Sequence, residues 1–122
     1  MRDRPTGAEL TILVQCIEEG DPDVEVPPDA RYRKLMLASA EAISGRQLEN
    51  GAVSERQERN RLNLILNKEG NLMSLNRDFV EAIREGRFDT GTNAWDQVRD
   101  HLWLTAIDRV SESNPKALID LS

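Results

Sequence analysis

Apolar residues recur along this chain at intervals of three and four, and this spacing constrains the fold more than any other feature of the sequence. The first run lies in residues 10–17, where the repeating apolar residues are Leu10, Leu13, Val14 and Ile17. An α-helix turns once in about 3.6 residues, so these side chains share one helix face. No segment alternates apolar and polar residues in the manner of a half-buried strand. The sequence therefore predicts an all-α fold.

Capping and breaking residues divide this pattern into about five helices. Thr6 and Glu9 have the spacing of a capping box, and Ser54 begins a second one. Asn50-Gly51 is a typical helix stop, and Asn71 is a typical N-cap. We expect a bundle with short connections whose helices span about residues 6–20, 29–51, 54–70, 71–86 and 93–114.

The length of the chain favours one domain over residues 1–122, with an ordered core from about 4 to 115 and a short tail after Pro115. The last expected helix carries the widest apolar arc, formed by Trp95, Val98, Leu102, Trp103, Leu104, Ala106, Ile107 and Val110. So broad an arc predicts a helix that is contacted on more than one side and forms the centre of the core.

Charge and composition exclude several classes of function. The chain has 22 acidic and 16 basic residues, a net charge of -6, which repels nucleic acid at long range. No apolar run approaches the length of a membrane span, and the first residues lack the apolar core of a secretory signal. We therefore expect a cytoplasmic protein with no nucleic-acid or membrane partner.

The chain has one cysteine, Cys16, and one histidine, His101. These counts exclude an internal disulfide, a cysteine metal cage and a cysteine redox pair. His101 falls on the polar side of its expected helix, beside Asp100, and neighbouring helical residues point in different directions. Since no spacing supports a catalytic triad or a Walker loop, we predict no catalytic residue, no cofactor, no metal and no enzymatic activity.

Basic residues gather at the start of the second expected helix. Arg31, Arg33 and Lys34, with Arg4 from the N-terminal segment, are suited to an anion pocket because arginine forks bind phosphate and carboxylate groups. The preceding loop also supplies acids that can pair with them, namely Asp21, Asp23, Glu25 and Asp29. Both interpretations of this basic patch follow from the sequence.

The chain resembles a known family in four segments. They are the opening Asp3-Arg4-Pro5-Thr6 with Glu9-Leu10, the stretches RYRKLMLASAEAISGRQLENG and LMSLNRDFVEAIREGRFD, and the closing Asn114-Pro115. It comprises small bacterial proteins of unknown function that are often encoded beside aminoglycoside-phosphotransferase-like kinases and acyl-CoA dehydrogenases. The resemblance covers nearly the whole chain and carries over no catalytic residue. It implies that Asp3, Arg4 and Pro5 form a docking element as well as leading into the first helix.

Three functions follow from these observations. The first is a non-catalytic accessory module that binds a kinase-like or acyl-CoA-metabolising enzyme through Asp3 to Thr6 and the basic residues Arg31, Arg33 and Lys34. The second is a small-molecule binder in which those basic residues hold an anionic group, such as a CoA ester or a phosphate. The third is a purely structural homodimer, which needs no other partner.

Overall fold

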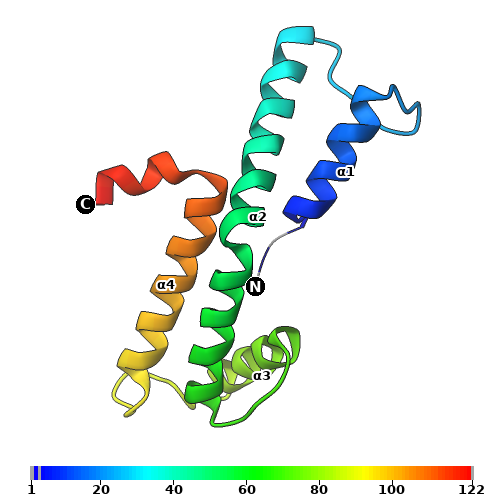
Figure 1. Cartoon of the computed structure of the whole chain (residues 1–122). Coiled ribbons are helices and arrows are strands. Elements are labelled where there is room, and N and C mark those ends of the chain that lie inside the picture. Colours follow the sequence, from blue (N-terminus) through cyan, green and yellow to red (C-terminus); the bar gives the residue numbers. More distant parts are fainter. Residues whose placement is uncertain (1, 3, 122) are drawn as a thin grey trace. The chain divides into compact units, whose positions relative to one another are not determined.

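The computed structural model of the chain describes residue 2 and residues 4–121, with side chains placed up to residue 119. All regular secondary structure in these residues is helical (Figure 1). The helices are α1 (Gly7–Glu18), α2 (Ala30–Leu66), α3 (Leu72–Arg84) and α4 (Trp95–Ser113), followed by the 3-10 helix η1 (Pro115–Leu121). The all-α prediction is confirmed, with four α-helices in place of about five. None of the described helices combines the length and the apolar character needed to cross a membrane.

The helix count differs because the second and third expected helices are one helix, α2, of 37 residues. The stop predicted at Asn50-Gly51 and the capping box predicted at Ser54 are both wrong, since all three residues lie inside α2. A glycine within a helix costs only about 1 kcal/mol relative to alanine, so it does not by itself end a helix. The left-handed turn that ends α2 comes at Asn67, whose φ is 51°.

The chain divides into two compact units, residues 2–51 and residues 52–122, and the division falls within α2. We call them the N-terminal unit and the C-terminal unit. The prediction of one domain over residues 1–122 remains a prediction.

In the N-terminal unit, α1 runs antiparallel to the first part of α2. Thr6 caps α1 as predicted, because its hydroxyl accepts a hydrogen bond from the Glu9 amide at 3.3 Å. Two polar contacts join the helices: the Gly7 amide donates to Gln47 Oε1 at 2.7 Å, and the hydroxyls of Thr11 and Ser44 are hydrogen-bonded. Polar contacts therefore contribute much of the specific pairing in this unit.

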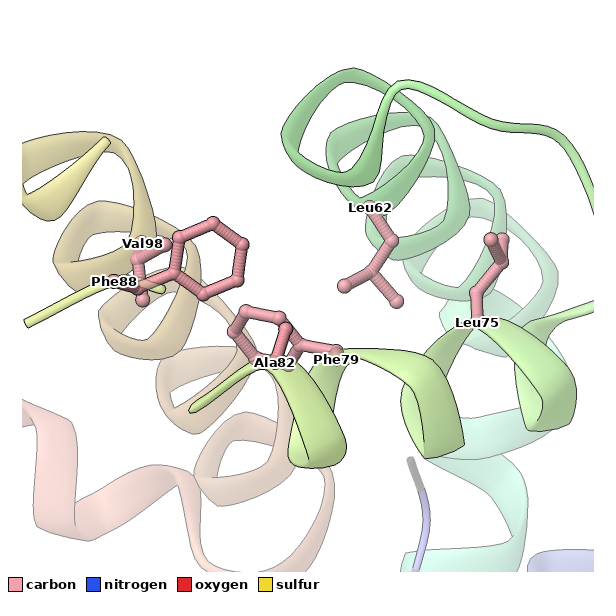
Figure 2. Close-up of a cluster of buried hydrophobic side chains, with 6 residues drawn as sticks. All are labelled: Leu62, Leu75, Phe79, Ala82, Phe88 and Val98. Carbon is pink, nitrogen blue, oxygen red and sulfur yellow. The ribbon is translucent and has the colours of Figure 1, made fainter. Parts of the chain in front are cut away.

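In the C-terminal unit, the helices surround an apolar core, shown in Figure 2. One side chain comes from α2, three from α3, one from the segment after α3 and one from α4: Leu62, Leu75, Phe79, Ala82, Phe88 and Val98. The rings of Phe79 and Phe88 lie 5.9 Å apart in a tilted arrangement. Asn71 caps α3 as predicted, since its side chain accepts a hydrogen bond from the Ser74 amide at 2.8 Å.

The prediction that the last long helix forms the centre of the core is wrong in its details. The side chains of Trp95, Leu102, Trp103 and Leu104 are 36%, 49%, 58% and 45% exposed. The buried residues of α4 are Val98, His101 and Glu112, so the buried face of this helix is largely polar. His101 is only 2% exposed, which contradicts its expected place on the polar, solvated side. Apolar periodicity fails here because the buried imidazole of His101 accepts a hydrogen bond from Arg61 of α2, and Glu112 pairs with Arg109 of its own helix.

The residues after Asn114 are also more ordered than the predicted tail. Pro115 ends α4, as expected, but residues 115–121 continue as η1. The Asn114 amide donates to the Val110 carbonyl at 2.7 Å, and the Ala117 amide donates to the Asn114 carbonyl at 3.1 Å. These bonds satisfy backbone groups at the end of α4 and lead directly into η1.

Candidate functional site

The structure places Arg4 in an ion pair of its own unit. Its guanidinium donates from Nε to Glu9 Oε1 at 3.1 Å and from Nη2 to Glu9 Oε2 at 2.9 Å. These hydrogen bonds lower the pKa of the Glu9 carboxyl and raise the pKa of Arg4. Arg4 is therefore committed to the start of α1, and Asp3 lies outside the described residues.

The other three residues of the basic patch lie in the first turns of α2. Arg33 is half-buried and donates from Nη1 to the Pro27 carbonyl at 3.5 Å. Arg31 and Lys34 are exposed, and neither forms an ion pair with another described residue. The anion pocket stays a prediction for Arg31, Arg33 and Lys34.

Two of the loop acids serve the backbone. Asp29 accepts a hydrogen bond from the Tyr32 amide at 2.9 Å and so caps α2, while Asp21 accepts one from the Asp23 amide at 2.9 Å. Turn and cap formation therefore engages these carboxylates locally, because the nearest backbone amides lie only two or three residues away.

The C-terminal unit contains a different constellation, which we call the polar network: Glu58, Arg61, Asn76, His101 and Thr105. Arg61 donates from Nε to His101 Nδ1 at 3.0 Å and from Nη2 to Thr105 Oγ1 at 3.1 Å. Asn76 donates from Nδ2 to Glu58 Oε1 at 3.3 Å and to the Leu72 carbonyl at 3.1 Å. Side chains of α2, α3 and α4 thus meet beside the apolar core.

Helical spacing brings these residues together. On α2, Glu58 and Leu62 are four residues apart, so the carboxylate and the core leucine lie on one face. On α4, Val98, His101 and Thr105 follow at intervals of three and four, so the imidazole and the hydroxyl accompany the core valine. The helical periodicity that places apolar residues on the buried faces of α2 and α4 therefore also places these residues of the polar network there.

His101 is neutral in this environment. Burial is the largest influence that lowers its pKa, and the positive charge of Arg61 adds to it, while the carboxylate of Glu58 opposes them. The result is a pKa of about 4. The imidazole ring meets the ring of Phe79 edge to face at 5.3 Å. Because Nδ1 accepts from Arg61, we assign the ring proton to Nε2.

Arg61 also borders an open groove of about 410 Å³ between α2 and α4. The groove is lined by Gln57, Asn60, Arg61, Leu104 and Asp108. All five residues belong to the C-terminal unit. The groove is large enough for a small ligand, and its wall combines one cation, one anion, two amides and one apolar side chain.

Sequence reasoning missed this site. The sequence carried one usable signal, the spacing of Val98, His101 and Thr105, which places His101 on the buried face once Val98 is known to be buried. For Arg61 and Asp108 no signal exists, because charged residues are common on every exposed helix face of this chain. Within the residues described, no three His, Cys, Asp or Glu side chains are arranged to hold a metal ion.

Residues 24–117 match the model of one protein family, whose description is Domain of unknown function (DUF6285). The matched segment contains α2, α3 and α4, and therefore the whole polar network and its groove. The segment Asp3 to Thr6 and α1 lie before it. No curated protein and no solved structure matches the chain. Because the match covers most of its length, the chain belongs to the DUF6285 family of domains of unknown function.

Proposed function

We propose that this protein is a non-catalytic accessory module that binds a larger enzyme through one face of α4. The observation that supports the proposal is an exposed apolar strip along that helix, which we call the α4 face: Trp95, Leu102, Trp103 and Ala106. At about 100° per residue these four positions fall within one arc of the helix. Both tryptophans of the chain belong to it.

The α4 face has the composition of a protein contact site. Large aromatic side chains supply much of the binding energy of interfaces when they enter a partner's pocket, whereas charged side chains collect at the rim. Trp103 is 58% exposed and Leu102 is 49% exposed. Arg99 lies within the same arc, four residues after Trp95 and four before Trp103, and it makes exposed ion pairs with Asp96 at 3.4 Å and with Asp100 at 3.7 Å. The α4 face therefore combines large apolar side chains with one charged residue, Arg99, whose acidic partners lie beside the arc.

The class of partner comes from the family resemblance. It implies a phosphotransferase-like kinase or an acyl-CoA-metabolising enzyme, and a docking element that includes Arg4; the basic patch adds Arg31 to the candidate surface. Arg31 is exposed and unpaired within the described residues, so it is accessible to such a partner. Arg4 is exposed but already bound to Glu9, so it is the weaker of the two candidates.

The test is a binding titration between the purified protein and each purified candidate enzyme. We expect Trp103→Ala to weaken binding about tenfold or more, as the loss of an interface tryptophan commonly does. The matched control is Met73→Ala, which removes a side chain that is 76% exposed but belongs to another helix, α3. Unchanged binding by Trp103→Ala would disprove the role of the α4 face.

Arg31→Ala tests the second surface in the same titration, and we expect a smaller loss because exposed ionic contacts contribute little. Light scattering on the protein alone tests the structural homodimer. If the wild type is a dimer that Trp103→Ala dissociates, and no enzyme binds, then the α4 face joins two copies and the accessory role is wrong.

A further inference from the structure

Arg61 is a half-buried cation that forms no ion pair with another described residue. It forms hydrogen bonds with two neutral groups, the His101 imidazole and the Thr105 hydroxyl. No carboxylate within the described residues lies at ion-pair distance from it. Charged side chains that lose solvent are normally paired, since burial of an uncompensated charge is costly. The position of Arg61 therefore suits an anion supplied from outside the chain.

The two hydrogen bonds also fix the direction in which Arg61 presents its remaining donors. Nε and one N–H of Nη2 form the side edge of the guanidinium, and they are directed to His101 and Thr105. Nη1 and the second N–H of Nη2 form the end edge, which has no partner among the described side chains. This edge has the parallel donor pair that binds a carboxylate in bidentate fashion.

A second unpaired charge lines the same groove. The carboxylate of Asp108 is half-buried and has no hydrogen bond or ion pair within the described part of the chain. It borders the groove with Arg61 but lies beyond ion-pair distance from it. Arg61 is tethered to His101 and Thr105, so the two opposite charges are held apart on one groove wall.

We propose that this groove is a binding site for a small zwitterion of amino-acid size. The ligand's carboxylate binds the end edge of Arg61, and its ammonium group binds Asp108, so each unpaired charge receives a partner of opposite sign. Leu104 provides an apolar contact for the ligand's side chain, and the amides of Gln57 and Asn60 provide further hydrogen bonds. A volume of about 410 Å³ accommodates a ligand of this size. This site is independent of the α4 face and of the proposed enzyme partner.

The proposal is tested by titrating the full chain with three ligands while recording amide NMR spectra. Leucine carries both charges, acetate carries only the anion, and butylamine carries only the cation. We expect leucine to shift the amide signals of residues around the groove with a Kd of about 1 mM or lower, and we expect acetate and butylamine to bind about tenfold more weakly. Leucine binding no tighter than that of acetate would overturn the proposal.

Two variants test which residue binds each charged group of the ligand. Asp108→Asn and Arg61→Lys are each expected to weaken leucine binding about tenfold, because each removes one charged or bidentate contact. The matched controls are Asp100→Asn and Arg59→Lys, which alter exposed residues of the same two helices outside the groove. Asp108 is only half-buried, so its variant keeps the test valid even if changes at Arg61 prevent folding.

A positioning role for Thr105 is tested by Thr105→Val, which removes the hydroxyl that holds Nη2 of Arg61. We expect leucine binding to fall several-fold while acetate binding changes less, because the direction of the end edge matters most for a ligand that contacts two charges. Equal binding of leucine by the wild type, Asp108→Asn and Arg61→Lys would also overturn the proposal.

Discussion

The surroundings of His101 determine the protonation state of this buried side chain. Its ring is 2% exposed, contacts Phe79 and accepts a hydrogen bond from Arg61. Burial and the neighbouring Arg61 both favour the neutral imidazole, because a charged ring would lose hydration and would lie beside another cation. The residue therefore acts as an acceptor that orients Arg61.

His101 makes the stability of the protein depend on pH. Its pKa is about 4 when folded, against an ordinary value of 6.5, so the unfolded chain binds a proton between these values and the folded chain does not. The stability that the neutral His101 contributes to the folded state is fully present above pH 6.5. It is lost as pH falls from 6.5 to about 4, and the free energy of unfolding then decreases by about 3 kcal/mol in total. Urea denaturation at several pH values measures this loss.

The control for that prediction is His101→Gln, whose amide oxygen still accepts from Arg61 but does not titrate. Carboxylates also titrate in this range, so the informative quantity is the difference between wild type and variant. A difference in unfolding free energy that stays constant from pH 7 to pH 4 would contradict the neutral, buried imidazole.

Two leucines of α2 differ sharply in burial. Leu62 is fully buried in the apolar core, and Leu64 is 73% exposed. We expect Leu62→Ala to lower the free energy of unfolding by about 3 kcal/mol, because it removes buried methyl groups and leaves a cavity. Leu64→Ala is expected to change it by less than about 0.5 kcal/mol. Chemical denaturation of both variants provides the measurement, and similar losses would contradict the burial pattern.

At the scale of the elements, α2 is the main departure from the sequence-based expectation. Asn-Gly at residues 50–51 and the polar run after Ser54 favour a break, yet the helix continues from Ala30 to Leu66. A Cβ added at Gly51 would lie 2.8 Å from the Arg2 guanidinium. Because glycine has no side chain, the guanidinium can approach the backbone of residue 51. The Arg2 Nη2 donates to the Gly51 carbonyl at 3.2 Å.

Alanine substitution distinguishes a continuous helix from a broken one. In a continuous helix Gly51→Ala increases the free energy of unfolding by up to about 1 kcal/mol, since only the flexible end of Arg2 must move. If Gly51 instead formed the left-handed end of a helix, alanine would destabilise the protein by about 1 kcal/mol or more.

Gly45→Ala is the control for Gly51→Ala. Position 45 is helical in both interpretations of α2, and apart from its chain neighbours and the adjacent helix backbone nothing lies within 4 Å of a Cβ placed there. We expect it to stabilise the protein by about 0.5–1 kcal/mol. Thermal unfolding of both variants measures the two changes in stability. A loss by Gly51→Ala of more than about 1 kcal/mol, which exceeds the cost of displacing Arg2 from the Gly51 carbonyl, would contradict a continuous α2.

At the scale of the whole molecule, the two units differ in apolar burial. In residues 2–51 the buried hydrophobic side chain is Val14, among the residues described. The C-terminal unit buries six such side chains in one cluster. Because opening free energy increases with the apolar surface that is buried, the N-terminal unit is expected to open more easily.

Hydrogen exchange of backbone amides measures this difference. We expect the most protected amides of α1 to exchange about tenfold faster or more than those of α3 and α4, after correction for intrinsic rates. Residues of α3 near Leu75 and Phe79 serve as the internal reference, because both side chains belong to the core. Equal protection of α1 and α3 would show that the two units open together.

The sequence alone determined the helical class, the caps at Thr6 and Asn71, and the boundaries of α3 and α4 to within a few residues. These features depend on local spacing and on hydrogen bonds between near neighbours, which any sequence displays directly. The buried apolar residues of α3 follow the same local spacing, since Leu75, Phe79 and Ala82 lie at intervals of four and three.

Only the tertiary structure decided which face of α4 is buried, whether α2 continues past Gly51, and how Arg61, His101 and Thr105 meet. Arg61 and His101 are 40 residues apart, so their contact depends on the packing of α2 against α4 and not on any local pattern. Polar residues are buried there because partners on neighbouring helices satisfy them, and a single sequence does not show those partners.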